Sequence, residues 1–391
     1  MFEIIDSEKS FSNGISPYSL IEGEFDVCQP YFRAKKEETP DAPVSKKRKK
    51  NNRNPSNADL DTKKRHQELR PQLISCLEQL PEKWPTNWKM KTSPTVIQPD
   101  AGNTQAVDFP SIQQMVETAR DKFSFETSQD DENDISVPEF EFNLQDTKEL
   151  DIFSIFNMVC INKSLTDVKL LQFTPSATYL IPPKSTFLMG SMENSLKQLG
   201  SYINKVGGAD LIVMDPPWPN KSVQRSSHYE TQDIYDLYSI PMRTMINNKD
   251  TIVAIWVTNK PKFRNFIINK LFPTWQLECV SEWVWLKMTT QVECIFPIDS
   301  DHKKPYEQLI IGRPIIKNNS RIDIPTSHVI VSVPSTRHSR KPPLHDVLNA
   351  YVNNKKDPIC VEMFSRCLYP GWISWGNECL KFQHLSYFEK K

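Results

Sequence analysis

Glycine is scarce in this sequence, and several diagnostic patterns are missing. The 391 residues include 10 glycines against 30 prolines, and no Gly-x-Gly-x-x-Gly run occurs. This absence excludes the glycine-rich phosphate loop of a nicotinamide-dependent dehydrogenase. No window approaches the roughly 18 consecutive apolar residues of a membrane-spanning helix, so we expect no membrane association. The N-terminus lacks the basic start and apolar run of a secretory signal, which favours an intracellular protein.

Metal-binding patterns are absent as well. The eight cysteines form no Cys-x-x-Cys pair, and the seven histidines form no His-Glu-x-x-His or His-x-x-x-His cluster. We therefore predict no metal site, and no disulfide framework in a chain of this length. The cysteines are interpreted as buried or incidental thiols.

Charge is balanced in total but unevenly distributed. The 48 lysines and arginines equal the 48 acidic residues in number. Basic clusters occupy Lys46–Lys50 and Lys63–Arg65, whereas acids dominate residues 126–151. Short, discrete basic clusters favour nuclear import over a nucleic-acid-binding arm, with a solvated tail as the plain alternative. We therefore expect a nuclear protein, with a cytoplasmic pool as the alternative.

Composition divides the chain into four parts. Within the second part, four leucines spaced by four, four and three residues from Leu69 to Leu80 mark one apolar helix face, which Pro71 either begins or kinks. The four parts are residues 1–60, mostly disordered; residues 61–125, a small helical region; residues 126–151, an acidic linker or, less simply, a segment folding back over a basic groove; and residues 152–385, the catalytic domain.

The fourth part alternates between strand-like and helical segments. Apolar strands that alternate with helices predict an α/β fold, with a mostly parallel sheet covered on both faces. Ligands bind such sheets at the carboxyl ends of the strands. We expect strands at residues 151–159, 185–189, 209–214, 251–257, 279–286, 307–312, 328–333 and 359–364, and helices at residues 192–203, 240–248, 261–270 and 344–354.

The most informative run is an apolar strand that ends in Asp215-Pro216-Pro217-Trp218. The two prolines have no amide hydrogen and force Asp215 away from helical geometry. The loop therefore offers one carboxylate, several carbonyl acceptors and one large aromatic ring. An exocyclic amine on a flat ring fits these groups, because the carboxylate and a proline carbonyl can accept its two hydrogens while the indole stacks on the ring.

Adenine carries such an amine, whose lone pair is delocalised into the ring. Acceptors for its two hydrogens favour a tetrahedral nitrogen that can attack an electrophilic methyl group. No strong general base is needed beforehand, because the proton becomes acidic only as methylation proceeds. Orientation and electrostatic preorganisation therefore carry most of the chemistry, and the histidines, including His338 and His345, are expected to be structural or phosphate-facing.

The Asp215–Trp218 run after an apolar strand resembles the catalytic signature of the eukaryotic adenine-N6 methyltransferases, the relatives of the messenger-RNA N6-methyladenosine writer. The resemblance covers about residues 150–385. It implies a Rossmann-like methyltransferase sheet, S-adenosyl-L-methionine as the cofactor, and a permuted motif order in which the catalytic loop precedes the main cofactor-binding strand. That strand would be Ile359–Phe364, which explains why no glycine-rich motif stands near the start of the domain.

The resemblance also implies site residues. Catalysis falls to Asp215, Pro216, Pro217 and Trp218. Lys341 matches a family lysine near the cofactor and the target base, where it pairs with the methionine carboxylate or supports the base-binding loop. The cofactor residues are Asp215, Lys341, Phe364, Arg366, Asn377 and Glu378, although Glu378 replaces a family amide and the loop from Arg366 to Trp372 is short. The substrate residues are Trp218, Asn220, Lys221, Arg337 and Arg340, the last two expected at phosphates.

Three segments resemble one branch of this family, namely Asn220–Ser222, Lys304–Glu307 and Pro370–Glu378. This branch implies N6-methylation of adenosine in small nuclear RNA, particularly of 2′-O-methylated adenosine. The target base must leave its stack, which costs a few kcal/mol in a duplex and favours RNA loops over duplex DNA. The alternatives are a DNA adenine methyltransferase and a catalytically silent nucleic-acid-binding subunit. We expect a monomer to be active, with any protein partner unknown.

Overall fold

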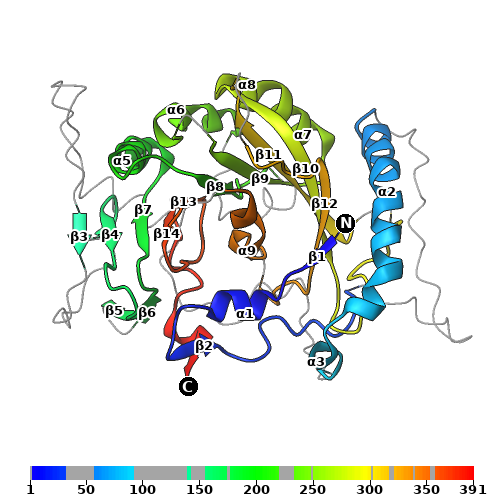
Figure 1. The fold of residues 1–391 in the computed structure, drawn as a ribbon, viewed down its shortest axis with the longest axis horizontal. Coiled ribbons are helices and arrows are strands. Elements are labelled where there is room, and N and C mark those ends of the chain that lie inside the picture. Colours follow the sequence, from blue (N-terminus) through cyan, green and yellow to red (C-terminus); the bar gives the residue numbers. More distant parts are fainter. Residues whose placement is uncertain are drawn as a thin grey trace, which may run out of the picture.

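A single sheet of eleven strands runs through the computed structural model of the chain (Figure 1). Its strand order is β1-β12-β10-β11-β9-β8-β13-β14-β7-β4-β3. Seven of its ten neighbouring pairs are parallel and three are antiparallel. The structure describes residues 2–31, 57–91, 139–141, 155–173, 177–219, 233–247, 250–300, 303–316, 321–337, 340–352 and 357–391.

The centre of the sheet is entirely parallel, which confirms the predicted α/β class. Its strands alternate between two apolar clusters: on β8, Ile212 and Met214 face one cluster, and Leu211 and Val213 face the other. A strand buried on both faces is typical of parallel sheets. The central strands are β9 (Ile252–Val257), β8 (Leu211–Met214), β13 (Cys360–Met363), β14 (Trp372–Gly376) and β7 (Thr186–Met189).

Both flanks of this centre include antiparallel strands. On one side lie β11 (Tyr306–Pro314), β10 (Leu277–Lys287), β12 (Ser327–Ser332) and β1 (Phe2–Ile4). On the other side lie β4 (Val159–Ile161) and β3 (Glu139–Glu141). Because β11 runs against both β9 and β10, its first residues lie at the edge where those two strands end.

Strand β13 comes late in the chain but lies between β8 and β14 at the centre of the sheet. The predicted catalytic run after β8 and the turn after β13 are therefore neighbours in space, although about 150 residues separate them in the sequence. This arrangement agrees with the permuted motif order that the resemblance implied.

Helices cover both faces of the sheet (Figure 1). One face packs against α5 (Met192–Lys205), α6 (Met242–Met245) and the continuous helical run of α7 (Pro261–Phe266), η4 (Ile267–Leu271) and α8 (Phe272–Thr274). The other face packs against α1 (Ser7–Ser12) and α9 (His345–Leu348). The remaining elements are β2 (Tyr18–Leu20), α3 (Thr86–Lys89), β5 (Lys169–Phe173), β6 (Ala177–Ile181), η3 (Ile234–Ser239), η5 (Asn349–Tyr351), η6 (Leu385–Tyr387) and β15 (Phe388–Lys390).

Residues 2–31 are ordered, so the prediction of disorder is wrong for this part of residues 1–60. Strand β1 pairs in parallel with β12 at the edge of the main sheet, and β2 pairs with β15 near the C-terminus. These partners lie more than 300 residues away in the sequence, and local periodicity cannot reveal such pairings. The basic cluster Lys46–Lys50 lies outside the described residues.

Helix α2 spans Asn57–Lys83, and Pro71 stands in its interior. Leu69, Leu73 and Leu80 are buried in a cluster with residues of β10 and β12, as their spacing predicted. Within the second basic cluster, Arg65 forms an ion pair with Glu282 on β10 at 2.6 Å. Residues 92–125 of the predicted helical region and most of the predicted acidic linker lie outside the described residues, while Glu139–Glu141 form β3.

Two further expectations concern the cysteines and membrane association. All eight cysteines are free thiols, and six of them are buried. Across the described ranges of the chain, no helix has the length and apolarity to cross a membrane.

Candidate active site

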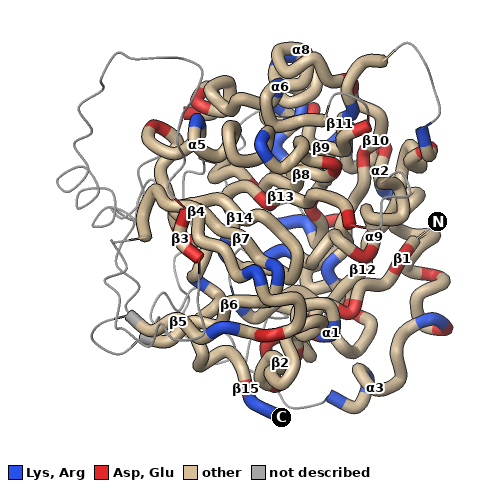
Figure 2. Tube along the Cα trace, turned by 60° about the vertical axis from the view of Figure 1, so that its left-hand side comes forward, with Lys and Arg blue, Asp and Glu red and all other residues tan. Residues whose placement is uncertain are grey.

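Charged side chains converge where the central strands end. Asp215 follows β8, Lys341 comes from the loop after β12, and Glu307 stands at the start of antiparallel β11. Arg366 and Glu378 follow the adjacent strands β13 and β14. The structure therefore brings most of the predicted site residues to one edge of the sheet, as expected for ligand sites in α/β proteins. Figure 2 shows basic and acidic positions interspersed over the described trace.

The Asp215–Trp218 turn is held at both ends. The backbone amide of Asp215 donates to the carbonyl of Met363 on β13 at 3.4 Å, and the amide of Trp218 donates to the Pro216 carbonyl at 2.8 Å. The Trp218 indole donates through Nε1 to the Trp256 carbonyl at 2.8 Å, and its ring centroid lies 4.9 Å from that of Phe263. Trp218 is thus a partly buried, fixed wall of the turn rather than a mobile ring.

A chain of alternating charges reaches Asp215. Lys341 Nζ lies 2.9 Å from Oδ2 of Asp215 and 3.2 Å from Oε2 of Glu307. The other oxygen of Glu307 pairs with Lys287 at the end of β10. The order is therefore Asp215, Lys341, Glu307, Lys287, and each of these side chains is mostly buried.

The pKa values show that Glu307 and Lys341, the two inner members of this chain, stay ionised. Burial opposes the charge on Glu307, but Lys287 and Lys341 outweigh it and lower the pKa of Glu307 to about 2. Burial also opposes the charge on Lys341, but Asp215 and Glu307 outweigh it and raise the pKa of Lys341. Lys341 is therefore a permanent cation at neutral pH, engaged with two carboxylates.

The predicted cofactor residues surround a sharp turn after β13. Phe364 has a φ of 60°, and the next residue, Ser365, passes close to β14. A Cβ at Gly376 would lie 3.0 Å from both the amide nitrogen and the carbonyl oxygen of Ser365, so this position requires glycine. Asn377 and Glu378 follow directly at the end of β14. The turn and these two residues form one corner of the sheet edge.

Glu378 forms two ion pairs in this corner. Its Oε2 lies 3.3 Å from Nε of Arg366 and 3.1 Å from Nζ of Lys381. Sequence reasoning placed Arg366 and Glu378 near the cofactor, and the structure adds that the two form an ion pair. Lys381 lay outside the prediction.

The hydrogen-bonding groups at the carboxyl edge of the sheet fit S-adenosylmethionine. The hydroxyls of Ser191, after β7, and Thr258, after β9, have buried oxygens with no hydrogen-bond partner in the described parts of the chain. Such groups are costly unless a polar ligand or water satisfies them. A carboxylate such as Glu378 can accept both hydroxyls of a ribose. Asn377, Glu378, Arg366 and Phe364 are the residues that would hold the cofactor here.

Glu362 was not singled out from the sequence. It lies on β13 and accepts a hydrogen bond from Ser365 Oγ at 2.7 Å. Burial, together with the nearby charge of Asp215, raises the pKa of Glu362 to about 7, although the Ser365 bond and Arg366 act in the opposite direction. A half-protonated carboxyl near neutral pH beside Asp215 makes the site sensitive to pH.

Arg340 corrects one substrate prediction. Its guanidinium is 1% exposed and lies over the ring of Phe11 at 4.1 Å, with Glu24 as its ion-pair partner at 3.4 Å. Arg337 pairs with the same carboxylate at 3.2 Å and is one-third exposed. The expected phosphate contact of Arg340 is wrong in this conformation, because a buried cation already paired with a carboxylate cannot reach a phosphate. Arg337 is only partly accessible.

The predicted substrate residues Asn220 and Lys221 lie outside the described residues. Tyr235 is exposed and lies beside Tyr238, with ring centroids 6.1 Å apart. In the portion of the chain that the structure describes, no group of three or more His, Cys, Asp or Glu residues is arranged to hold a metal ion.

Three acidic residues were missed by sequence reasoning. Glu307 stood in a segment quoted only for its resemblance, and its position at the site follows from the antiparallel direction of β11. Glu362 has no sequence signal beyond its place on the proposed cofactor strand. Glu24 belongs to the region that we expected to be disordered, so no local pattern could have found it.

The chain is similar to known proteins over part of its length. Residues 209–378 match the MT-A70 family model. The chain is 43% identical over 248 residues to the human N(6)-adenine-specific methyltransferase METTL4, an alignment that covers 61% of this chain and 50% of the human one. It is 39% identical over 219 residues to the N6-methyladenosine RNA methyltransferase MTA1 of Pyricularia oryzae, covering 53% of this chain and 56% of the relative.

A third relative differs in the nucleic acid that its name gives. The DNA N6-methyl methyltransferase of Caenorhabditis elegans is 34% identical over 212 residues, covering 54% of this chain and 55% of the relative. The chain thus spans about half the length of the curated relatives it matches. The matched region contains the Asp215 turn, Lys341 and the corner at Glu378, so the chain is similar to the MT-A70 family over the residues that form the candidate site.

Proposed function

We propose that the protein is an S-adenosylmethionine-dependent methyltransferase that transfers a methyl group to the N6 nitrogen of adenosine in RNA. The observation that carries this proposal is the Asp215 carboxylate, which is fixed by Lys341 beside a proline-walled turn at the carboxyl edge of the sheet. The match of residues 209–378 to the MT-A70 family model and the activities in the names of the relatives support it.

Asp215 would accept one hydrogen of the adenine amine, and a proline carbonyl of the turn would accept the other. Both groups are held by the protein before substrate binds, so no reorganisation is needed during the reaction. When bound, S-adenosylmethionine supplies the electrophilic methyl group. As the nitrogen gains that methyl, its proton becomes acidic and passes to the Asp215 carboxylate or to solvent.

Lys341 serves this step by orientation. Its ammonium group fixes one oxygen of Asp215 and leaves the other for the substrate amine. Glu307 balances the charge of Lys341, and Lys287 balances that of Glu307. Of the two roles expected for Lys341, support of the base-binding loop agrees with these contacts, because its ammonium group already engages two carboxylates.

RNA is the preferred substrate in this proposal, and adenosine in small nuclear RNA, particularly with a 2′-O-methyl group, is its finer form. A base in a loop reaches a pocket at a strand end without the cost of opening a duplex. The second candidate is DNA, which the name of the nematode relative favours. A nuclear location, on the basis of Lys46–Lys50 and Lys63–Arg65, and activity as a monomer belong to the same proposal.

The test uses single-turnover methyl transfer to RNA and DNA oligonucleotides of matched sequence, together with total cellular RNA. Wild type is expected to transfer label to N6 of adenosine, faster on RNA, and the carrier RNA then identifies the target. Asp215→Ala should bind RNA normally and transfer no methyl group. A faster reaction on DNA would favour the second candidate, and failure to bind S-adenosylmethionine in calorimetry would favour a silent binding subunit.

A further inference from the structure

Glu24 lies outside the matched family region, and its carboxylate holds the loop that carries Lys341. The residue is 3% exposed and follows β2 in the N-terminal segment. Its Oε1 accepts from Nε of Arg337 at 3.2 Å, and its Oε2 accepts from Nη1 of Arg340 at 3.4 Å. Its backbone carbonyl accepts from the amide of Thr336 at 2.8 Å. One residue thus contacts three positions of the loop between β12 and Lys341.

Arg340 is the direct neighbour of Lys341 and is enclosed by aromatic rings from both ends of the chain. Its guanidinium carbon lies 4.1 Å from the ring centroid of Phe11, 5.6 Å from Phe25 and 5.1 Å from Phe382. A planar cation between rings, paired with a buried carboxylate, has little freedom to move. The backbone that leads into Lys341 is therefore fixed by contacts other than the Asp215 ion pair.

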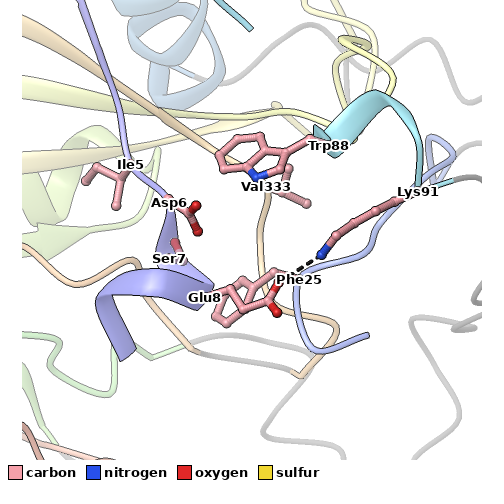
Figure 3. A pocket seen from close by; sticks show the side chains of 8 residues that line it. All are labelled: Ile5, Asp6, Ser7, Glu8, Phe25, Trp88, Lys91 and Val333. Atoms are coloured by element: carbon pink, nitrogen blue, oxygen red, sulfur yellow. Dashed lines mark hydrogen bonds and ion pairs between the residues drawn. The ribbon is translucent and has the colours of Figure 1, made fainter. Parts of the chain in front are cut away.

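The N-terminal segment is itself attached firmly enough to act as an anchor. Lys91 Nζ donates to Glu8 at 2.8 Å and to Asp26 at 2.6 Å. Figure 3 shows Lys91 reaching Glu8 across a small hollow lined by Phe25 and Trp88. A second connection comes after Lys341, where Ser10 Oγ donates to Asp346 at 2.7 Å. The segment therefore holds the loop of Lys341 on both sides.

We propose that Glu24 is a positioning residue for methyl transfer, acting through Arg340 on Lys341 and thereby on Asp215. The proposal rests on the function proposed above. It assigns the N-terminal segment, which lies outside the region common to the family, a part in the geometry of the active site. The carboxylate of Glu24 does not touch substrate or cofactor; it fixes the cation that precedes Lys341, and Lys341 in turn fixes the acceptor of the reacting amine.

The test compares Glu24→Gln with Lys341→Met and with the double variant, all in the full chain. Glutamine keeps the size of the side chain but removes the charge that compensates two guanidinium groups. The control is Asp250→Asn, because Asp250 is also a buried carboxylate with two arginines, Arg313 at 3.7 Å and Arg321 at 3.5 Å. Asp250 precedes β9 and so lies at the opposite edge of the sheet.

We expect Glu24→Gln to lower kcat for methyl transfer about tenfold, since small misplacement of a positioned group is costly. The KM values for S-adenosylmethionine and for the RNA oligonucleotide should change less than about twofold. The double variant with Lys341→Met should be no slower than Lys341→Met alone, because both substitutions act on the same contact. Asp250→Asn should keep the wild-type kcat, and adding it to Lys341→Met should leave the kcat of Lys341→Met unchanged.

Urea unfolding of each variant separates positioning from folding. The proposal is overturned if folded Glu24→Gln has the kcat of wild type, or if its loss multiplies with that of Lys341→Met. If Glu24→Gln fails to fold, Arg340→Lys provides the same comparison, because it keeps the charge but not the planar fork, and the same two outcomes overturn the proposal. Absence of methyl transfer by wild type on every RNA and DNA substrate would instead refute the proposed function itself.

Discussion

The two edges of the central sheet both contain buried acidic residues, but they use them differently. At the carboxyl edge, the partner of Asp215 is a side chain, Lys341, which pairs in turn with Glu307. At the amino edge, Asp210 accepts from the backbone amide of Ile359 at 2.9 Å and from the side-chain amide of Asn247. Asp210 is almost fully buried, whereas about a quarter of the Asp215 side chain is exposed.

This difference distinguishes a carboxylate that joins neighbouring segments from one that remains accessible to a ligand. The two carboxylate oxygens of Asp210 join Ile359, directly before β13, to Asn247, in the turn before β9. The backbone carbonyl of Asp210 also accepts from the amide of Ile252 at 2.9 Å. Asp215 is held from one side by Lys341 and keeps an exposed side. Burial alone therefore does not identify the site; an acceptor that is fixed and still accessible does. Each prediction below changes one edge and asks whether the other is affected.

The largest expected effect is that of Lys341→Met on activity. Loss of the ammonium group leaves Asp215 and Glu307 without the cation between them, so the acceptor loses its orientation and two carboxylates repel each other. We expect kcat to fall by two to three orders of magnitude, as for loss of a preorganised electrostatic contact. Single-turnover kinetics with labelled S-adenosylmethionine measures this. A kcat within a few-fold of wild type would show that the ion chain of Asp215, Lys341, Glu307 and Lys287 is not needed for methyl transfer.

Asp210→Ala should affect the stability of the fold and not the activity. The substitution leaves the buried amide of Ile359 and the side chain of Asn247 without their acceptor. We expect the free energy of unfolding to fall by about 2–4 kcal/mol, which urea denaturation can measure. The rate per folded molecule should stay unchanged. If this variant were fully stable but slow, the two edges would not divide structure from function as the contacts indicate.

Glu362→Gln should give a smaller effect that depends on pH. The folded pKa of Glu362 is about 7 and its ordinary value is 4.5, so the folded state holds the proton more tightly. Wild type then loses stability as pH rises from about 4.5 through 7, by about 2–3 kcal/mol. Glutamine cannot ionise, so the variant should gain stability relative to wild type between pH 5 and pH 8. Urea unfolding of wild type and variant at pH 5 and at pH 8 tests this. The prediction is contradicted if the difference in unfolding free energy between variant and wild type is the same at both pH values.

The sequence predicted the central sheet well because its signals are local. Apolar strands such as Leu211–Met214 and Ile252–Val257 are bounded by turn residues. The proline pair after β8 marks the predicted catalytic turn. Strand β14 was missed as a strand, because Trp372–Gly376 is short and is bounded by glycines that read as loop.

The electrostatic arrangement of the site could not be predicted in the same way. Lys341 was identified by resemblance, but its two carboxylate partners come from β8 and from the start of β11, and only the strand order brings them together. Arg340 was assigned to phosphate on charge and position alone. Its burial depends on Phe11 and Glu24, which lie more than 300 residues earlier in the sequence, and no periodicity relates them.

The account depends on Asp215 as the acceptor for the adenine amine, and one measurement tests it directly. Wild type and Asp215→Asn are compared in single turnover on an RNA oligonucleotide with one adenosine, and the methylated nucleoside is identified. Asparagine keeps the shape of the side chain but removes its charge. We predict N6-methyladenosine from wild type and a rate at least about 100-fold lower from the variant, with RNA binding unchanged. Equal rates, or a methyl group on any atom other than N6, would contradict the account.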